Sequence, residues 1–216
     1  MPVFLLSDDI SFPSPHLAEK DGLLAVGGDL TEQRILRAYA EGIFPWYSPG
    51  SPILWWSPDP RLVLLPGELK VSRSLRQCLK KGTFRITVNT AFEEVIRSCA
   101  EIRRKGQSGT WITGEMTDAY IGLHRAGYAH SVEAWDSDGL AGGLYGIILK
   151  KAFFGESMFA KKSNASKAAF ATFVDRLRLQ GFQVVDCQMK TAHLMSLGAR
   201  EISRNAYLKI LKKALA

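Results

Sequence analysis

The 216-residue sequence has few of the residues that metal sites and disulfide frameworks require. Its three cysteines, Cys78, Cys99 and Cys187, are odd in number and show no C-x-x-C spacing. Small buried thiols in a reducing cytosol are therefore favoured over disulfides. The four histidines are scattered along the chain, so no metal site is predicted.

Long apolar runs are also missing. No stretch approaches the roughly 20 apolar residues that a membrane-spanning helix needs. The first residues, MPVFLLSDDISFPSP, have no basic segment ahead of their short apolar run, so no signal peptide is predicted. With 46% hydrophobic residues the chain can bury a sizeable core, and we predict a cytoplasmic globular protein with no membrane partner.

Acidic residues are in the minority, which gives a formal net charge of +7 and a pI near 9.4. This balance favours an anionic partner, nucleic acid first, although many soluble proteins are mildly basic for no specific reason. Clustering favours the nucleic-acid interpretation. The clusters are Lys70, Arg73, Arg76, Lys80 and Lys81; then Arg103, Arg104 and Lys105; then Lys150, Lys151, Lys161, Lys162 and Lys167.

The chain changes character near residue 60. Seven of the nine prolines precede position 60 and an eighth lies at it, around one helix that Thr31 begins and Gly42 ends. From Arg61 onward, strand and helix patterns alternate regularly. We therefore predict a small N-terminal domain over residues 1–60 and a catalytic domain over residues 61–216.

The second part predicts an α+β fold. After two early helices and their strands come three successive strands, at 129–135, 140–150 and 151–159, then a long helix over 165–180 and a strand over 182–188. Two short helices near 191–197 and 203–213 end the chain. This order is that of a Gcn5-related acyltransferase fold, a mixed β-sheet flanked by helices.

The strand VVDCQ carries the first candidate site. In a regular strand Asp186 and Gln188 share one face and Cys187 points to the other. They lie at the carboxyl end of a strand that follows a helix, a frequent place for ligand chemistry in α/β sheets. The alternative is that both are turn residues.

The stretch FFGESMF carries the second candidate. If it is a regular strand, Phe154, Glu156 and Met158 share one face, and Gly155 lets a ligand or backbone approach closely. One carboxylate would then line an otherwise apolar pocket. The alternative is a bulged edge strand with Glu156 in solvent, which the apolar flanks on both faces disfavour.

Two further features narrow the chemistry. The segment Lys162–Lys167, KSNASK, opens the long helix without the glycines that a CoA pyrophosphate loop needs, so a CoA site is disfavoured. Trp46, Trp55, Trp56 and Trp111 lie in loops or at element ends. Two of the four are expected to be structural, and we predict that Trp46 and Trp111 stack on unpaired bases.

The sequence resembles the leucyl/phenylalanyl-tRNA–protein transferase family over nearly its whole length. The motifs that carry the resemblance occur in order: GLLAVGGDL (22–30), GIFPW (42–46), ILWWSPDPR (53–61), GTWIT (109–113), the 123–133 run containing AHSVE, GGLYG (142–146), FFGESMF (153–159), SNASKAA (163–169), DCQ (186–188) and SLGA (196–199).

The resemblance implies an enzyme that moves Leu, Phe or, less readily, Met from aminoacyl-tRNA to the N-terminal Arg or Lys of a protein, which marks that protein for N-end rule degradation. It implies no cofactor. Asp186 and Gln188 match the family's proposed catalytic pair and Glu156 its active-site glutamate. Trp46 and Trp111 match the residues that hold the 3′-terminal adenosine.

The residues give this assignment a chemical rationale. The donor is an activated ester, so aminolysis needs a neutral amine, a nearby proton acceptor and oxyanion stabilisation. We predict that Gln188 orients the amine, Asp186 polarises it and Glu156 meets the cationic acceptor, while Phe153, Phe154 and Met158 surround the aminoacyl side chain. An acyl-CoA N-acyltransferase and a non-catalytic RNA-binding module are the rival classes.

Overall fold

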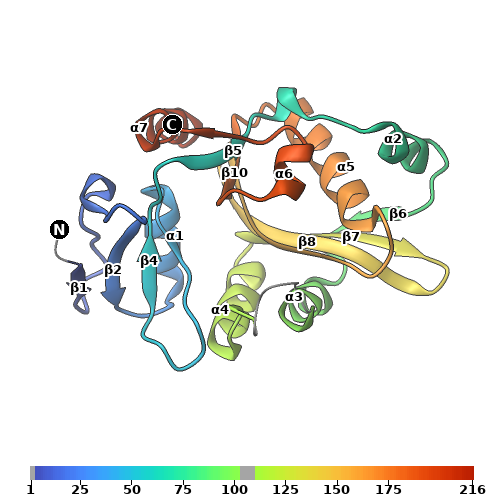
Figure 1. The fold of residues 1–216 in the computed structure, drawn as a ribbon. Coiled ribbons are helices and arrows are strands. Elements are labelled where there is room, and N and C mark those ends of the chain that lie inside the picture. The colour runs from blue at the N-terminus through green and yellow to red at the C-terminus, as the bar shows by residue number, and fades with distance from the viewer. Residues whose placement is uncertain (1–2, 103–109) are drawn as a thin grey trace.

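The computed structural model describes residues 3–102 and 110–216, which form two β-sheets and their helices (Figure 1). The small sheet contains β1 (Phe4–Leu6), β2 (Leu23–Gly27), β3 (Phe44–Pro45) and β4 (Leu54–Trp56). The large sheet contains β5 (Arg61–Leu64), β6 (Arg85–Val88), β7 (Ala129–Asp136), β8 (Gly139–Leu149), β9 (Ala152–Ala160), β10 (Val184–Gln188) and β11 (Arg200–Ile202). The α-helices are α1 (Glu32–Ala40), α2 (Arg73–Lys80), α3 (Phe92–Glu101), α4 (Gly114–Arg125), α5 (Ala165–Leu179), α6 (Ala192–Ser196) and α7 (Arg204–Ala214).

The large sheet has the order β11-β5-β10-β9-β8-β7-β6. All neighbours are antiparallel except β9 and β10, which α5 connects in parallel. Helices α3 and α4 lie on one face, and α2 and α5 on the other (Figure 1). The α+β class and the mixed sheet flanked by helices, both predicted from the sequence, are confirmed.

Local signals explain where the helices begin and end. The hydroxyl of Thr113 accepts the backbone N–H of Met116 at 3.2 Å, as expected for a cap of α4, and Gly127 follows that helix with φ of +85°. Asn164 precedes α5 in the left-handed conformation, with φ of +65°, and its side chain makes no capping hydrogen bond to the helix.

The N-terminal unit contains more β-structure than its proline content indicates. Trp55 is fully buried at its centre and donates its indole N–H to the Gly27 carbonyl at 2.9 Å. One buried cluster continues from this unit into the large sheet and α7; a Cβ on Gly42 would lie 2.9 Å from the Tyr207 side chain. A domain boundary near residue 60 therefore stays a prediction, although the two sheets divide there.

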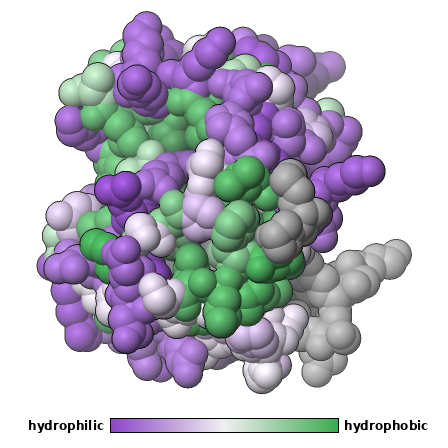
Figure 2. All heavy atoms as spheres, turned by 90° about the vertical axis from the view of Figure 1, so that its left-hand side faces the viewer, coloured by the Kyte–Doolittle hydropathy of each residue, from purple (hydrophilic) through white to green (hydrophobic). Residues whose placement is uncertain are grey.

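Exposed apolar side chains gather on the N-terminal unit. Leu5 is 84% exposed on β1, whose one partner in the described sheet is β2. Figure 2 turns this side of the molecule toward the viewer and shows apolar surface between polar areas. Val3, Ile10 and Leu17 are further exposed apolar residues from the same segment.

Residues 3–102 and 110–216 contain neither a membrane-spanning helix nor a candidate metal site. No helix there is long and apolar enough to cross a membrane. No group of three or more His, Cys, Asp or Glu side chains in the same ranges could hold a metal ion.

Candidate active site

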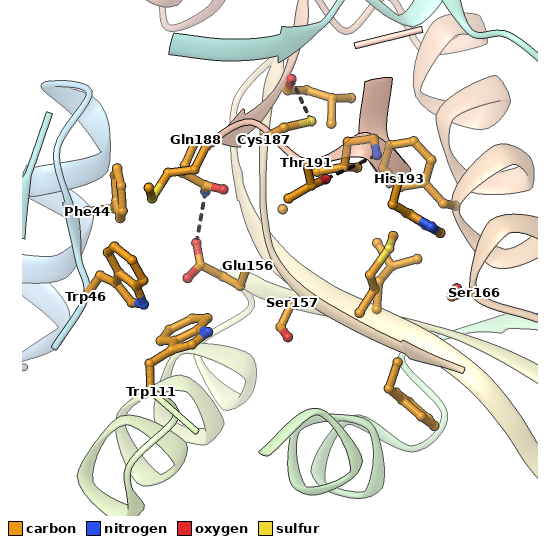
Figure 3. Close-up of a pocket in the computed structure, with 18 of the residues that line it drawn as sticks. Phe44, Trp46, Trp111, Glu156, Ser157, Ser166, Cys187, Gln188, Thr191 and His193 are labelled. Atoms are coloured by element: carbon orange, nitrogen blue, oxygen red, sulfur yellow. Dashed lines mark hydrogen bonds between the residues drawn. The ribbon is translucent and has the colours of Figure 1, made fainter. Parts of the chain in front are cut away.

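The candidate site is a cavity of about 640 Å³ at the point where β9 and β10 separate. These parallel strands pair from Val184–Ala152 to Asp186–Phe154, and no pair follows, although β9 continues to Ala160. Beyond the last pair the cavity opens between them (Figure 3). Its volume lies within the usual range for small-molecule sites.

A β-bulge in β9 places Glu156 at this opening. In the β8–β9 ladder Gly146 pairs with Gly155, but Tyr145 pairs with Ser157, so Glu156 is the extra residue. Such bulges re-aim side chains next to active sites. Gly146 is required here, because a Cβ at this position would lie 2.1 Å from the Phe154 carbonyl oxygen.

The bulge makes the predicted face of FFGESMF wrong. Phe154 packs into the buried cluster that contains Tyr120, whereas Met158 packs against the cluster that contains Phe170, on the other side of the sheet. A one-residue insertion reverses the alternation of every side chain after it. Sequence periodicity assumed a regular strand and could not reveal this reversal.

Two of the three predicted side-chain-pocket residues are also wrong. Phe153 and Phe154 are fully buried, in the clusters on opposite faces of the sheet, and neither lines the cavity. Their strand positions come before the point at which β9 and β10 separate. Met158, which follows the bulge, does line the cavity.

Glu156 is held by two tyrosines. Tyr39 of α1 donates to Oε1 at 2.6 Å, Tyr120 of α4 donates to Oε2 at 3.0 Å, and Gln188 Nε2 lies 3.4 Å from Oε1. Burial raises the pKa of this carboxyl group to about 7, and the two tyrosine hydrogen bonds work in the opposite direction. Its charge therefore changes near neutral pH.

Asp186 is fully buried and does not line the cavity. Arg61 binds both of its carboxylate oxygens, at 2.9 Å from Nε and 2.7 Å from Nη2, and the Tyr207 hydroxyl donates to Oδ2 at 2.7 Å. Burial opposes the charge of Arg61, but Asp186 more than offsets this and keeps the pKa of the guanidinium above its usual value. The prediction that Asp186 polarises the amine directly is wrong, because this carboxylate faces the protein interior.

Gln188 connects Asp186 to the cavity. Its backbone N–H donates to Asp186 Oδ1 at 3.0 Å, and its φ of +52° is unusual for a residue with a side chain. This i to i+2 bond is the Asx-turn pattern that stabilises such a conformation. Cys187 is an extra residue in the β10–β5 pairing, so this strand is bulged too. The side chain of Gln188 then lies beside Glu156 in the cavity (Figure 3).

The end of the cavity away from Glu156 is largely apolar. Ser166 and His193 line the cavity on that side (Figure 3), and Leu144, Met158, Phe170, Val185, Cys187 and Leu194 belong to the apolar cluster on the face of the sheet opposite Tyr39 and Tyr120. We call these eight residues the deep lobe. The Nε2 atom of His193 is buried without a hydrogen-bond partner among the described residues. Burial, and then the nearby charge of Lys167, lowers the pKa of His193, so the lobe stays uncharged at neutral pH.

Aromatic side chains form the opposite wall. Trp46, from the segment after β3, and Trp111, from the segment before α4, lie next to each other beside Glu156 (Figure 3). Phe44 continues this wall above them. Trp55 is buried and Trp56 supports Trp46 by donating to its carbonyl oxygen at 2.7 Å. The assignment of Trp46 and Trp111 to base stacking stays a prediction.

The structure brings only some of the predicted basic clusters together in space. Lys70, Arg73, Arg76, Lys80 and Lys81 are all exposed on or beside α2. Residues 103–105 lie outside the described residues. The third cluster is not a spatial cluster: Lys150 and Lys151 precede β9 and Lys161 and Lys162 follow it, roughly 30 Å apart along an extended strand. Lys162 also pairs with Asp136 and Asp138.

Sequence reasoning missed the residues that hold the candidate carboxylates: Tyr39, Tyr120, Arg61 and Tyr207. A tyrosine on the apolar face of a helix needs a partner for its hydroxyl when buried, which was a usable signal for Tyr39 and Tyr120. Arg61 opens the otherwise apolar strand RLVLL, and a buried cation there requires an anion. None of these signals identifies the partner.

Sequence comparisons agree on one family. Residues 63–212 match the family described as leucyl/phenylalanyl-tRNA protein transferase, and residues 28–59 match the N-terminal domain of the same family. The leucyl/phenylalanyl-tRNA–protein transferase of Anaeromyxobacter sp. (strain K) is 61% identical over 215 residues, which cover 100% of this chain and 92% of that protein. The protein of the same name from Myxococcus xanthus (strain DK1622) is 54% identical over 217 residues, covering 100% and 93%.

Similarity to solved structures is much weaker. A GCN5-related N-acetyltransferase from Kribbella flavida shares 11% identity with a TM-score of 0.40, over 78% of this chain and 60% of that one. L-PGS from Bacillus licheniformis shares 10% identity with a TM-score of 0.42, over 78% and 54%. Overlaps this low have no bearing on function.

Proposed function

This chain belongs to the leucyl/phenylalanyl-tRNA–protein transferase family and is an aminoacyltransferase, and we propose that it moves Leu, Phe and, less readily, Met from tRNA to the N-terminal Arg or Lys of proteins. The reaction would take place in the cytoplasm, where charged tRNA is found, and would mark its products for degradation.

One observation carries this proposal: a single cavity joins an apolar end to an anionic end. The deep lobe suits the side chain of Leu, Phe or Met, and Glu156 suits a guanidinium or ammonium group. Gln188 lies beside Glu156 in the same cavity (Figure 3), and the donor ester and the acceptor amine would meet at this side chain. The third feature, the wall of Trp46 and Trp111, suits the adenosine that joins the amino acid to tRNA.

Gln188 is the residue best placed to orient the attacking amine. Its Nε2 lies near Glu156, which leaves the amide oxygen to accept a hydrogen bond from the acceptor's α-amino group. An amide is not a strong base, so Gln188 contributes orientation. The amine nitrogen forms a bond to the ester carbonyl carbon, the bond to the ribose oxygen breaks, and that oxygen gains a proton as the amine loses one.

The deep lobe accounts for the proposed donor preference. An apolar pocket distinguishes side chains by volume, and one methylene is worth only about 1–3 kcal/mol. Leu, Phe and Met should therefore all be accepted, while Ile and Val, which branch at Cβ, should fit badly. Of the three residues predicted to surround the aminoacyl side chain, only Met158 lines the cavity. Leu144, Phe170 and Val185 line it as well.

The test of this function is a transfer reaction. Radiolabelled Leu-tRNA is incubated with the protein and a peptide that begins with Arg, and the label is followed into the peptide. A second peptide that begins with Ala serves as control. Label in the Arg peptide alone is expected, and a lack of transfer at every pH and peptide concentration would refute the proposal.

Replacing Trp46 or Trp111 with Ala should weaken binding of a minimal donor, aminoacyl-adenosine. Stacking of one base on an indole is worth about 1–3 kcal/mol, so an increase in Kd of roughly 5- to 150-fold is expected. Trp135→Ala is the matched control, since its indole N–H bonds to Thr87 on β6 and its ring does not line the cavity. Unchanged binding in both site variants would make the two tryptophans structural.

Neutralising Arg76 and Lys80 on α2 should weaken tRNA binding and reduce its salt dependence. Each phosphate contact contributes about −0.9 to the slope of log affinity against log salt on a duplex, so losing two contacts should change the slope by roughly 2. The control is neutralisation of Lys212 and Lys213, exposed on α7. An equal loss in both variants would mean that no particular surface, only net charge, attracts tRNA.

A further inference from the structure

Tyr39, Tyr120 and Glu156 form a closed triangle of polar contacts. The two hydroxyl oxygens lie 2.6 Å apart, Tyr39 Oη lies 2.6 Å from Glu156 Oε1, and Tyr120 Oη lies 3.0 Å from Oε2. The three side chains come from α1, α4 and β9, so the triangle also connects the N-terminal unit to the large sheet. Both tyrosines are fully buried.

The triangle has three contacts but only two hydroxyl hydrogens when Glu156 is ionised. If both hydroxyls donate to the carboxylate, no hydrogen remains for the short contact between the two tyrosines. A protonated Glu156 supplies the missing hydrogen: the acid donates to Tyr120, Tyr120 to Tyr39 and Tyr39 to Oε1. The ionised form has fewer but charge-assisted hydrogen bonds, which are stronger than neutral ones. The geometry therefore accommodates both forms.

We propose that Tyr39 and Tyr120 are positioning residues that hold the Glu156 carboxyl group toward the acceptor and set the pH at which it becomes charged. This inference rests on the proposed function, because it assigns the ionised Glu156 to the cationic acceptor. The two tyrosines touch neither reacting atom; they act through the carboxylate. Loss of one hydroxyl removes a charge-assisted bond from the ionised form, so ionisation then requires a higher pH.

The other groups around Glu156 do not change the direction of this expected shift to higher pH. In residues 3–102 and 110–216, further charged and titratable groups near Glu156 are Asp186 on β10, Arg61 on β5, Tyr145 on β8, which packs edge-on against Tyr120, and Tyr207 on α7, which binds Asp186. Lys190, after β10, lines the same cavity and pairs with Glu201. Asp186 opposes ionisation of Glu156 and Arg61 favours it. Neither is altered by removing the Tyr39 hydroxyl, because they bind each other and Tyr207.

The test compares pH profiles of transfer to an Arg-starting peptide. In Tyr39→Phe the acidic limb of the kcat/KM profile should shift to higher pH by roughly half to one unit. Removing a hydrogen-bond donor destabilises the ionised carboxylate more than it destabilises the neutral acid. The acceptor amine titrates identically with wild-type and variant enzyme, so its effect cancels. At high pH the variant should regain the wild-type rate, which a purely structural defect would not allow.

Matched variants make the result decisive. Tyr47→Phe removes a buried tyrosine hydroxyl that lies 3.3 Å from Thr113 Oγ1, and its profile should stay unchanged. Tyr120→Phe should shift the limb upward like Tyr39→Phe, and it decides the question if Tyr39→Phe does not fold. When Glu156 is already replaced by Gln, adding Tyr39→Phe should cause no further shift in the pH profile of kcat/KM. If wild-type protein transfers label but both tyrosine variants keep its pH profile, or shift it downward, the positioning role is wrong while the transferase function stands.

Discussion

Asp186→Ala is expected to lose about 3–5 kcal/mol of its free energy of unfolding, because it leaves a buried cation without its anion. The side chains of Arg61 and Asp186 are 1% and 0% exposed. The guanidinium also lies 4.7 Å from the ring centroids of both Phe44 and Tyr207, so it has no route to solvent. A loss of this size is a large part of the 5–15 kcal/mol typical of a folded domain.

Urea denaturation, followed by tryptophan fluorescence, measures this loss. The matched control is Asp175→Ala, which breaks an exposed pair with Arg178 at 2.9 Å and should cost less than about 1 kcal/mol. A stability close to wild type in Asp186→Ala would contradict the prediction. It would mean that Arg61 can be solvated or rearranged in the folded protein.

Folding and chemistry are separated by replacing the whole ion pair. Arg61→Met combined with Asp186→Leu removes both charges, and well-packed apolar replacements for buried pairs are often neutral or stabilising. This double variant should regain part of the stability but not turnover, because the backbone N–H of Gln188 and the buried hydroxyl of Tyr207 both lose their acceptor, Asp186. Asp186 and Gln188 would then act as one unit, with Asp186 positioning Gln188.

Periodicity predicted the regular part of the catalytic unit well. The helix predicted over 165–180 and the strands predicted over 129–135 and 182–188 are present as α5, β7 and β10, with ends shifted by at most two residues. The helix combines a clear apolar pattern with Gly181 just beyond its end. The N-terminal sheet was missed because its strands have only two to five residues and lie between prolines, where no pattern can repeat.

The sequence named several residues that lie together, but it did not give their geometry. Glu156, Gln188, Trp46, Trp111 and Met158 line one cavity, whereas Asp186, Phe153 and Phe154 do not, and the roles of all eight stay predictions. Two bulges, at Glu156 and Cys187, then move neighbouring side chains to faces that strict alternation does not give. Bulges depend on the register between strands far apart in the chain, and that information is not local. For the same reason the sequence could not pair Asp186 with Arg61, 125 positions away.

Glu156→Gln is expected to raise the KM for an Arg-starting peptide by roughly 30-fold to several thousand-fold, because truncating or neutralising one partner of a buried charge pair costs about 2–5 kcal/mol. The rate at saturating peptide should change much less. Binding of a non-reacting aminoacyl-tRNA analogue should stay as it is in wild type, because the deep lobe and the tryptophan wall are intact. Steady-state transfer kinetics over a range of peptide concentrations measure both parameters.

The stability of the same variant shows that the lost affinity is not a folding defect. Glu156 has a pKa of about 7 in the folded protein against 4.5 as a free side chain. Between these values the folded state binds more protons than the unfolded state, so wild-type stability falls as pH rises from about 4.5 to 7. Glutamine does not titrate. Above pH 7 Glu156→Gln should therefore be more stable than wild type, by an amount on the order of 1–3 kcal/mol.

The opposite kinetic result would change the role of Glu156. If acceptor affinity is kept and turnover at saturating peptide is lost, Glu156 takes up the proton that the amine releases. A pKa near neutrality would suit a general base, and the tyrosine triangle would then stabilise the protonated acid. Measuring KM and kcat separately distinguishes the two roles. Weaker recognition of the acceptor's charge raises KM and is overcome by more peptide. A missing proton acceptor lowers kcat, and more peptide does not restore it.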